Sequence, residues 1–139
     1  MQYDYYIASR WRNLDTVLSL THSIRSAGKS VYSFLEAPHN IHALDYDIEQ
    51  AMEEYEAIDD WWHDVRIRRM FDDDIRGIEQ SHALILLLPA GKSAHIEAGI
   101  AFGMGKECIL VGEQRETENL YLIFGRAYPS IDHFMQTLA

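Results

Sequence analysis

The sequence predicts an α/β protein with a flavodoxin-like (Rossmann-like) fold, in which helices cover both faces of a parallel five-stranded sheet. Segments of strand character alternate with segments of helical periodicity along the chain, and this alternation is typical of parallel sheets. The strand segments Ala83–Leu88 and Glu107–Val111 are almost wholly apolar, as strands buried on both faces are. The 139 residues suit one domain over positions 1–139.

The other elements follow from local patterns. Aromatic residues predict a first strand over Tyr3–Ser9. Apolar positions at helical spacing then lead to Gly28, where a helix would end. The remaining predictions are a strand at Ser30–Leu35, helices at Asp45–Ile58, Trp61–Gln80 and Ala94–Gly105, a short edge strand at Leu120–Phe124 and a closing helix at Ile131–Leu138.

Charge and composition exclude several classes of function. The net charge is −10, with carboxylates concentrated between Glu36 and Asp74, so no basic face is available for nucleic acid. No apolar run reaches the ~18 residues that a membrane span needs. The first residues lack the pattern of a signal peptide, and the single cysteine, Cys108, cannot form an internal disulfide. We therefore expect a cytoplasmic protein that binds neither nucleic acid nor a membrane.

A ligand site is expected where the strand order of the sheet reverses. In parallel sheets, ligands bind beyond the carboxyl ends of the strands at such a point. The loops Ser9–Asn13 and Pro89–Ser93 follow the first and third predicted strands. Both loops should therefore open at the same edge of the sheet.

The segment Gly91–Gly99 is the strongest candidate within those loops. It is not a phosphate-binding loop of the Walker type, because Leu86 occupies the position where that loop needs its first glycine. A helix that begins here would still offer unpaired N–H groups to an anion. Ser93 is either a ligand contact or the N-cap of this helix, and Glu97 is either catalytic or a first-turn carboxylate that offsets the helix dipole.

Acidic and basic residues elsewhere also have two interpretations each. Asp72–Asp74 has the character of a solvated helix face, but Asp74 lies at the edge of the predicted apolar stripe. Arg10 and Arg12 directly follow the first strand and either bind an anion or pair with carboxylates. The tryptophans favour core or interface positions over stacking with a base.

Histidines give little support to a metal site. His39 and His42 are three residues apart, but Pro38 favours a loop there, and neither a carboxylate nor a cysteine completes a recognisable ligand spacing. We expect no metal and no cofactor.

With these residues in view, the chain resembles the nucleoside 2-deoxyribosyltransferase family and its nucleotide N-hydrolase relatives. Tyr6–Trp11 resembles the first strand and loop of the family, and Asp74–Ile78 resembles its Asp-Leu-x-Gly-Ile helix. Gly91–Gly99 resembles its Gly-x-x-x-Glu-x-Gly stretch, with Ser93 in place of the first glycine. Ala101–Lys106 resembles the Ala-x-x-x-Gly-Lys continuation, so that the likeness covers nearly the whole chain in the same order.

The resemblance implies cleavage or transfer at the N-glycosidic bond of a nucleoside or a nucleoside 5′-monophosphate. Glu97 would be the catalytic carboxylate that faces the anomeric carbon, Asp74 would position or protonate the base, and Tyr6 would orient Glu97. The loop of Ser9, Arg10 and Trp11 would face the sugar or its 5′ substituent, and Gly91 and Ser93 are further candidate substrate contacts. The two arginines of the first loop favour a monophosphate.

Two departures from the family pattern keep other functions open. Gly91 replaces an acidic residue or serine found in many members, and His82 replaces an acidic residue that often precedes the third strand. The alternatives are an NAD-cleaving glycohydrolase like certain Toll/interleukin-1 receptor domains, which share the fold, and a catalytically silent nucleotide-binding sensor.

The middle of the chain has more aromatic surface than one core of this size needs. Tyr55, Trp61, Trp62 and Phe71 carry this surface, and relatives in the family commonly form dimers or larger assemblies. We therefore expect a homo-oligomer built from dimers.

Overall fold

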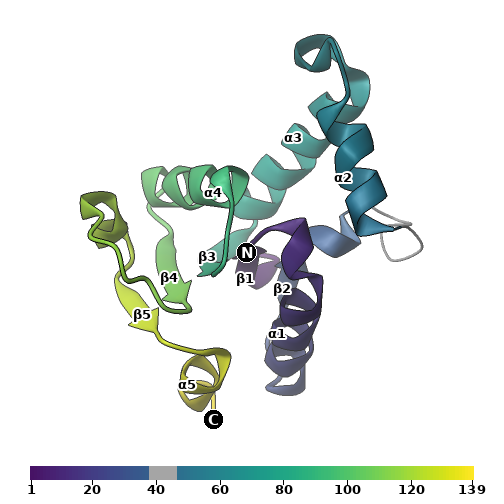
Figure 1. Cartoon of the computed structure of the whole chain (residues 1–139). Coiled ribbons are helices and arrows are strands. Elements are labelled where there is room, and N and C mark those ends of the chain that lie inside the picture. The colour runs from purple at the N-terminus through teal and green to yellow at the C-terminus, as the bar shows by residue number, and fades with distance from the viewer. Residues whose placement is uncertain (38–46) are drawn as a thin grey trace.

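The computed structural model describes residues 1–37 and 47–139, and within them five strands form one parallel sheet in the order β2-β1-β3-β4-β5. The strands are β1 (Tyr3–Ala8), β2 (Val31–Ser33), β3 (Ser81–Leu87), β4 (Glu107–Val111) and β5 (Arg126–Tyr128). The helices are α1 (Leu14–Ser26), α2 (Ile48–Glu56), α3 (Val65–Glu79), α4 (Lys92–Gly103) and α5 (Ile131–Gln136). The predicted flavodoxin-like α/β fold is confirmed (Figure 1).

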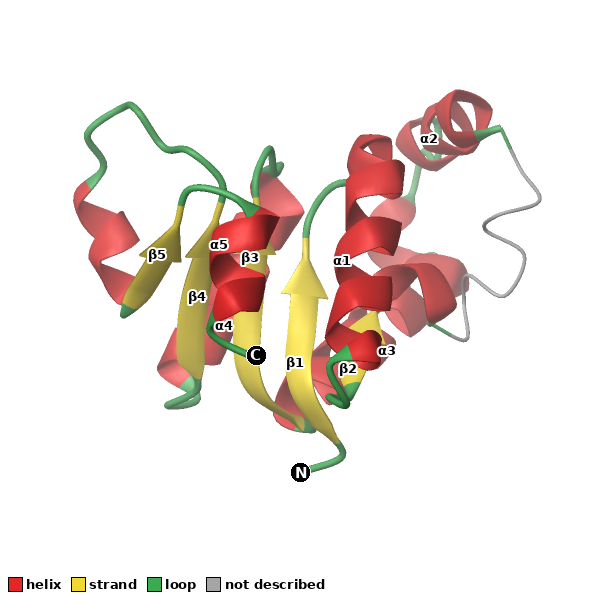
Figure 2. Cartoon of the chain, turned by 90° about the horizontal axis from the view of Figure 1, so that it is seen from below, coloured by secondary structure: helices red, strands yellow, loops and turns green. Residues whose placement is uncertain are grey.

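Helices cover the two faces of the sheet in pairs. Helices α1 and α5 lie on one face, and α3 and α4 lie on the other (Figure 2). Each pair closes its own apolar cluster over alternate residues of the same strands, because successive strand residues point to opposite faces.

The strand order reverses between β1 and β3, as expected. From β1 the chain moves outward to β2, whereas from β3 it moves the other way to β4 and β5. Ser9 joins the two central strands at this point, since its hydroxyl donates a hydrogen bond to the carbonyl oxygen of Leu87 at 2.9 Å. The loops after β1 and β3 therefore meet at the carboxyl edge of the sheet.

The loop after β4 also approaches this edge closely. Gly112 has a φ of 122°, and a Cβ atom at this position would lie 2.7 Å from the Cβ of Leu88. A side chain is therefore excluded there for two reasons, backbone conformation and space.

Cys108 lies on β4, beneath α4. Its side chain is buried and its thiol lies 3.6 Å from the carbonyl oxygen of Ala98. Burial, followed by the nearby charge of Glu107, raises the pKa of this thiol to about 11. The thiol is therefore protonated at neutral pH and screened from solution.

The predicted edge strand at Leu120–Phe124 is wrong. Residues Asn119–Ile123 form a 3-10 helix, and the edge strand is β5, which pairs with Ile109–Val111 of β4. The apolar run Leu120–Phe124 fits either element, because Tyr121 and Phe124 are three residues apart and face the same side in a 3-10 turn. Their rings contact each other, with centroids 5.2 Å apart, and Glu118 caps the turn through the N–H of Leu120.

Other boundaries also differ from the prediction, among them the helix predicted at Ala94–Gly105, which covers Lys92–Gly103. The second strand ends at Ser33, because a 3-10 turn follows at Phe34–Glu36. The long helix begins at Val65, where the carboxylate of Asp64 accepts a hydrogen bond from the N–H of Arg66. The second helix covers Ile48–Glu56 with Asp47 as its N-cap, and the rest of its predicted start lies outside the described residues.

None of the helices in the described part of the chain has the length and apolar character required to cross a membrane.

Candidate active site

The candidate site begins with a tyrosine of β1 and a glutamate of α4. Tyr6 is fully buried on the face of the sheet covered by α3 and α4. Its hydroxyl donates a hydrogen bond to Oε2 of Glu97. Glu97 lies in the second turn of α4, and the first turn holds no acidic residue, so Glu97 does not occupy the position of a first-turn carboxylate that offsets the helix dipole. The small residues Ala94, Ala98 and Ala101 are buried on the same helix. They let α4 lie close to the sheet, within reach of the tyrosine.

Asp74 of α3 supplies a second carboxylate to the same place. Its Oδ1 atom is buried, and its charge acts on Glu97, Tyr6 and Tyr32. Burial, followed by the charge of Asp74, raises the pKa of Glu97 to about 8, against the lowering effect of the Tyr6 hydrogen bond. Two close carboxylates in a poorly solvated site cannot both ionise easily, which is the physical cause of this shift.

Tyr6 is also one of two stacked tyrosines beside the carboxyl groups of Glu97 and Asp74. The rings of Tyr6 and Tyr32 are nearly parallel, with centroids 5.0 Å apart. The stack lies against Gly77 of α3, because an added Cβ there would be 2.9 Å from both rings. Gly77 is three residues after Asp74. The same stretch of α3 therefore provides the Asp74 carboxylate and leaves room for the ring of Tyr6, whose hydroxyl contacts Glu97.

The tyrosine hydroxyl stays protonated throughout the neutral range. Burial, followed by the charges of Glu97 and Asp74, raises the pKa of Tyr6 well above its usual value. Tyr6 therefore acts as a hydrogen-bond donor that fixes the orientation of Glu97. The site then has one donor, two carboxyl groups and one readily exchanged proton, which suits chemistry that needs both a carboxylate and an acid.

The loop after β1 divides into buried and exposed parts. Ser9 is buried, and its hydroxyl also accepts a hydrogen bond from Asn13 at 3.1 Å. The ring of Trp11 packs edge-on against Phe34, with centroids 5.3 Å apart. Arg12 binds both carboxylate oxygens of Glu49 in α2, at 2.9 and 3.3 Å, whereas Arg10 is exposed.

The start of α4 differs from the sequence prediction. Gly91 is the N-cap and Ser93 lies within the first turn, so Ser93 is not the cap. The carbonyl oxygen of Gly91 accepts from Nδ1 of His95 at 2.7 Å, which places the ring proton on Nδ1. In the neutral ring, Nε2 then accepts a hydrogen bond from the hydroxyl of Tyr121, also at 2.7 Å. His95 thus joins the loop after β3 to the 3-10 turn before β5.

An open hollow of about 470 Å³ lies beside His95 and Tyr121. Leu88, Pro89 and Ala90 line one side, and the loop after β4 lines the other with Glu113, Glu116 and Glu118 among its residues. Glu97, Asp74 and Tyr6 are absent from its lining. The hollow is therefore separate from the carboxylate pair, which remains the candidate site.

Metal-binding side chains do not gather near this pair. Across residues 1–37 and 47–139, no three His, Cys, Asp or Glu side chains are arranged to hold an ion. The predicted pair His39 and His42 lies outside the described residues.

The sequence could not reveal two members of this site, Tyr32 and Gly77. Tyr32 comes from β2, and its position beside Tyr6 depends on the strand pairing of β1 with β2, in which the two residues are direct partners. Gly77 reads as an ordinary helix glycine until the stack is seen. The only earlier signal was its place in the Asp74–Ile78 motif.

Fold and site together define a flavodoxin-like α/β protein with two carboxyl groups and a tyrosine at the centre of one sheet face. In sequence comparisons the chain matches no protein-family model and no curated protein. Among solved structures it is similar to the 2-deoxyribosyltransferase of Bacillus psychrosaccharolyticus, with a TM-score of 0.65 and 16% identity over 96% of this chain and 94% of that one.

Two further solved structures share the fold. The CMP N-glycosidase BcmB of Clostridium botulinum has a TM-score of 0.55 at 17% identity, over 96% of each chain. The TIR domain of the Toll-related receptor TRR-2 from Hydra magnipapillata has a TM-score of 0.56 at 14% identity, over 91% of this chain and 83% of that one. The predicted resemblance to deoxyribosyltransferases and nucleotide N-glycosidases is thus confirmed for the fold.

Proposed function

We propose that this protein cleaves the N-glycosidic bond of a nucleoside or nucleoside 5′-monophosphate, or transfers its sugar, with Glu97 as the nucleophile. The observation that carries the proposal is the half-buried Glu97 carboxyl group, which accepts a hydrogen bond from Tyr6 and is affected by the charge of Asp74. The similar folds of a 2-deoxyribosyltransferase and a CMP N-glycosidase support this bond as the target.

The reaction has two steps, in which Glu97 is first the nucleophile and then the leaving group, and Asp74 is first the acid and then the base. The ionised carboxylate of Glu97 attacks the anomeric carbon, and the bond from that carbon to the base nitrogen breaks with its electron pair going to the base. Protonated Asp74 delivers its proton to the departing base. A water molecule, or a second base, then displaces Glu97 from the ester and loses a proton to Asp74.

The raised pKa of Glu97 fits this sequence of steps. With a pKa of about 8, Glu97 keeps a proton at neutral pH in the free protein. That proton has to leave Glu97 before attack, and Asp74 is the neighbouring carboxylate that takes it. One proton shared by the pair therefore produces the nucleophile and the acid together.

The substrate end of the site includes Arg10. Arg12 is engaged by Glu49 in α2, whereas Arg10 is exposed in the loop that follows β1. A guanidinium group binds a phosphate through two parallel hydrogen bonds. We therefore assign Arg10 to the 5′-phosphate of a monophosphate, and Ser9, Trp11, Gly91 and Ser93 to the surrounding loops that shape the sugar subsite.

A base-release assay tests the reaction. The protein is incubated with nucleosides, their 5′-monophosphates and NAD, and the free base is separated by chromatography. Glu97→Ala should reduce release by at least about 10³-fold, while Glu79→Ala, at an exposed position of α3, should not. Release that survives Glu97→Ala would refute the assignment of the nucleophile.

The same panel separates the alternative functions. Nicotinamide release from NAD alone would make the protein an NAD glycohydrolase, a reading favoured by the TIR-like fold. Thermal stabilisation by a nucleotide without any base release would make it a sensor.

The phosphate assignment has its own control within one loop. Arg10→Ala should lower the efficiency on a monophosphate by roughly tenfold or more and leave a free nucleoside unaffected. Arg12→Ala removes an equal charge two residues away. If Arg10→Ala affects both substrates equally, Arg10 does not bind the phosphate.

A further inference from the structure

One side chain of the edge strand β2 contacts both halves of the candidate site. The ring of Tyr32 stacks on that of Tyr6, the residue that donates to Glu97, and the two ring planes are 8° apart. The outer end of the Tyr32 ring lies against α3, because a Cβ atom added at Gly77 would be 2.9 Å from its Cζ atom. Tyr32 therefore lies between the tyrosine that orients Glu97 and the helix that carries Asp74.

The hydroxyl group of Tyr32 lies on the turn of α3 that begins beside Asp74. It donates a hydrogen bond to the carbonyl oxygen of Asp73 at 3.4 Å, a length at which such a bond is weak. Carbonyl oxygens within a helix also accept an N–H from four residues further on. Rotation about the Cζ–O bond of Tyr32 therefore costs little, and it can direct the hydroxyl hydrogen to a different acceptor on the same turn.

We propose that Tyr32 is a positioning residue for Asp74, whose carboxylate accepts a hydrogen bond from the Tyr32 hydroxyl when it ionises. This inference rests on the proposed function, in which Asp74 exchanges a proton with Glu97 and with the base. The two stacked tyrosines then have parallel tasks, since Tyr6 orients one carboxyl group of the pair and Tyr32 orients the other.

The Tyr32 hydroxyl keeps its proton over the whole range in which carboxyl groups titrate. Burial, followed by the charge of Asp74, raises the pKa of Tyr32 to about 13. The charge of Asp74 acts on this hydroxyl more strongly than the charges of Asp73, Tyr3 and Glu97 do. The hydroxyl is therefore a permanent donor, and Asp74 is the carboxylate that influences it most.

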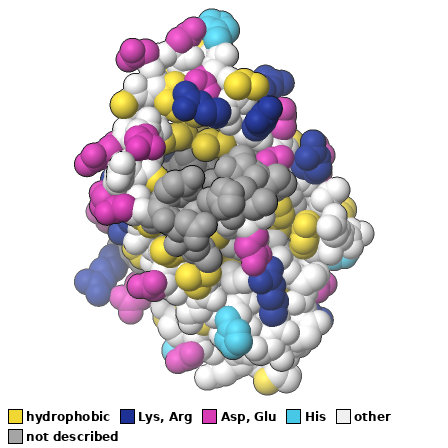
Figure 3. All heavy atoms as spheres, turned by 90° about the vertical axis from the view of Figure 1, so that its right-hand side faces the viewer, with side chains coloured by type: hydrophobic (Ala, Val, Ile, Leu, Met, Phe, Trp, Pro, Cys, Tyr) yellow, Lys and Arg dark blue, Asp and Glu magenta, His cyan; other side chains and the backbone are white. Residues whose placement is uncertain are grey.

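Other charged groups around Tyr32 are already engaged. The carboxylate of Asp73 lies 3.6 Å from the guanidinium of Arg76, and the carboxyl group of Glu97 accepts from Tyr6. Carboxylates and basic side chains are interspersed over the described surface on the side of the molecule where α2 lies (Figure 3). This surface therefore adds no strong potential of a single sign, and local contacts govern the proton of the carboxyl pair.

The two ionisations of the carboxyl pair should depend on different tyrosines. The charge of Asp74 contributes to the raised pKa of Glu97, so Asp74 is ionised while Glu97 still holds its proton. The first ionisation of the pair therefore belongs mainly to Asp74, and the second belongs mainly to Glu97. Loss of the Tyr32 hydroxyl removes a donor that favours ionised Asp74, and the first ionisation should then move to higher pH. Loss of the Tyr6 hydroxyl should instead move the second ionisation.

A titration followed by carboxyl-carbon NMR tests this assignment without any turnover. Asp74→Asn and Glu97→Gln identify the two signals of the pair. In Tyr32→Phe, which keeps the ring and its stack, the Asp74 signal should titrate about one pH unit higher and the Glu97 signal should move less. Tyr3→Phe is the matched control, because Tyr3 contacts the Tyr32 ring edge-on at 5.5 Å and should move neither signal. Circular dichroism verifies that each variant is folded.

The rate of base release against pH gives a second readout. Tyr32→Phe should move the rise of the rate at acid pH to higher pH by about one unit and leave the fall at alkaline pH in place. A merely structural role would lower the rate by the same factor at every pH. If the wild type releases no base from any substrate, the proposed function fails, and the NMR titration still decides the role of Tyr32. An Asp74 signal that does not move in Tyr32→Phe, or that moves equally in Tyr3→Phe, would overturn the proposal.

Discussion

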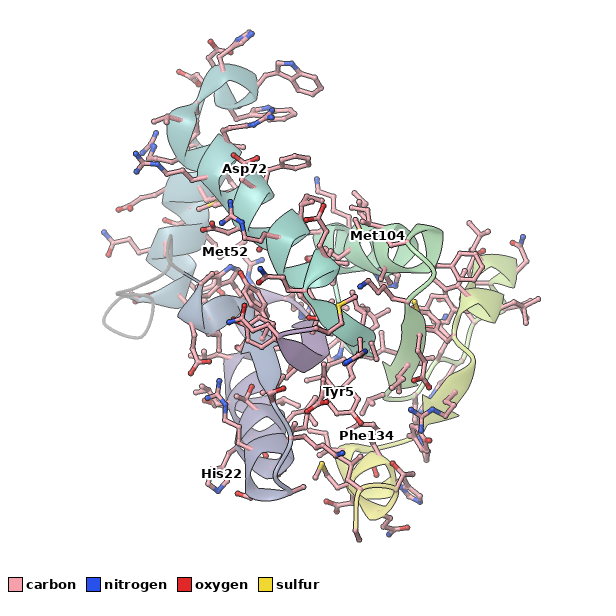
Figure 4. All side chains as sticks on the ribbon, turned by 180° about the vertical axis from the view of Figure 1, so that it is seen from behind. Tyr5, His22, Met52, Asp72, Met104 and Phe134 are labelled. Atoms are coloured by element: carbon pink, nitrogen blue, oxygen red, sulfur yellow. The ribbon has the colours of Figure 1, made fainter. Side chains whose placement is uncertain are left out.

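Two neighbouring tyrosines of β1 show how differently the two faces of the sheet are used. Tyr5 points toward α5, where its ring meets Phe134 edge-on at 5.7 Å (Figure 4). Tyr6 points the other way, where it stacks on Tyr32 and donates to Glu97. The same type of residue is therefore part of an apolar cluster on one face, as Tyr5, and of a polar centre on the other, as Tyr6.

The helices that cover the two faces differ in the same way. Bulky residues of α1 and α5, namely Val17, Leu20, Ile24 and Phe134, fill the space over one face. Helix α4 instead contributes three alanines to the other face. Small residues there let the helix backbone lie near the sheet and bring a carboxylate to a strand residue. One face thus contributes chiefly to stability, and the other combines stability with chemistry.

The largest expected effect concerns stability on the first face. Phe134→Ala should lower the free energy of unfolding by about 3–5 kcal/mol, because it leaves a cavity beneath a fully buried ring. Urea unfolding measures this loss. Phe102→Ala, at a position that is exposed on α4, should change the free energy by less than about 1 kcal/mol. Similar losses for both variants would contradict the contrast.

The second effect is a gain in the free energy of unfolding, not a loss, and its size depends on pH. Glu97 has a folded pKa of about 8, above the ordinary glutamate pKa of 4.5, so its contribution is favourable below pH 4.5 and is lost as the pH rises toward 8. Glu97→Gln removes the ionisation and should stabilise the protein at high pH by about 2 kcal/mol, allowing for partial solvent access.

Thermal unfolding across pH measures that difference. The gain from Glu97→Gln should disappear as the pH falls to the value at which free glutamate titrates. Glu79→Gln, on the surface of α3, should show no such trend. A constant difference between wild type and Glu97→Gln at all pH values would mean that Glu97 is not desolvated.

A third, smaller effect compares two helical glycines. Gly77→Ala places a methyl group 2.9 Å from the rings of Tyr6 and Tyr32, and the resulting strain of about 1–3 kcal/mol exceeds the helix-propensity gain of about 1 kcal/mol. Gly99→Ala meets open space and should stabilise the protein by roughly 0.5–1 kcal/mol. Equal responses in chemical unfolding would show that the tyrosine stack yields easily.

The smallest effect concerns the two tyrosines themselves. Tyr6→Phe removes one hydrogen bond to Glu97, a loss of about 1 kcal/mol or roughly fivefold in rate. That bond lowers the pKa of Glu97, so in the variant the carboxyl pair keeps its shared proton to higher pH and the fall of the rate at alkaline pH should move to higher pH. Tyr5→Phe should leave the rate and its pH dependence unchanged. A shift with Tyr5→Phe would refute the division between the faces.

Sequence reasoning is strongest where the signal is local or continuous. The apolar runs of β3 and β4 predict a buried parallel sheet, whereas the pairing of Glu97 with Asp74 follows from the family resemblance and not from any local pattern. Contacts between segments that are distant in the sequence could not be predicted in this way. Tyr32 reaches Tyr6 only through the pairing of β1 with β2, and Gly77 matters because of two rings from other elements.

Short elements with ambiguous periodicity were the other source of error. The apolar run Leu120–Phe124 is consistent with a short strand, yet Tyr121 and Phe124 also satisfy a three-residue period. The pairing partner of β4 is instead Arg126–Tyr128, a segment of three residues with little strand character of its own. This segment forms a strand because it pairs with β4, and no local sequence pattern predicts that pairing.

The buried thiol of Cys108 can be used to measure local opening of the protein. Because the thiol lies against Ala98 of α4, an alkylating reagent in solution can reach it only when that helix lifts from the sheet. The rate of labelling therefore measures the free energy of this local opening in the unmodified chain. A nucleotide that binds beside Glu97 and holds α4 in place would slow the labelling, so a single cysteine can register occupancy without any turnover.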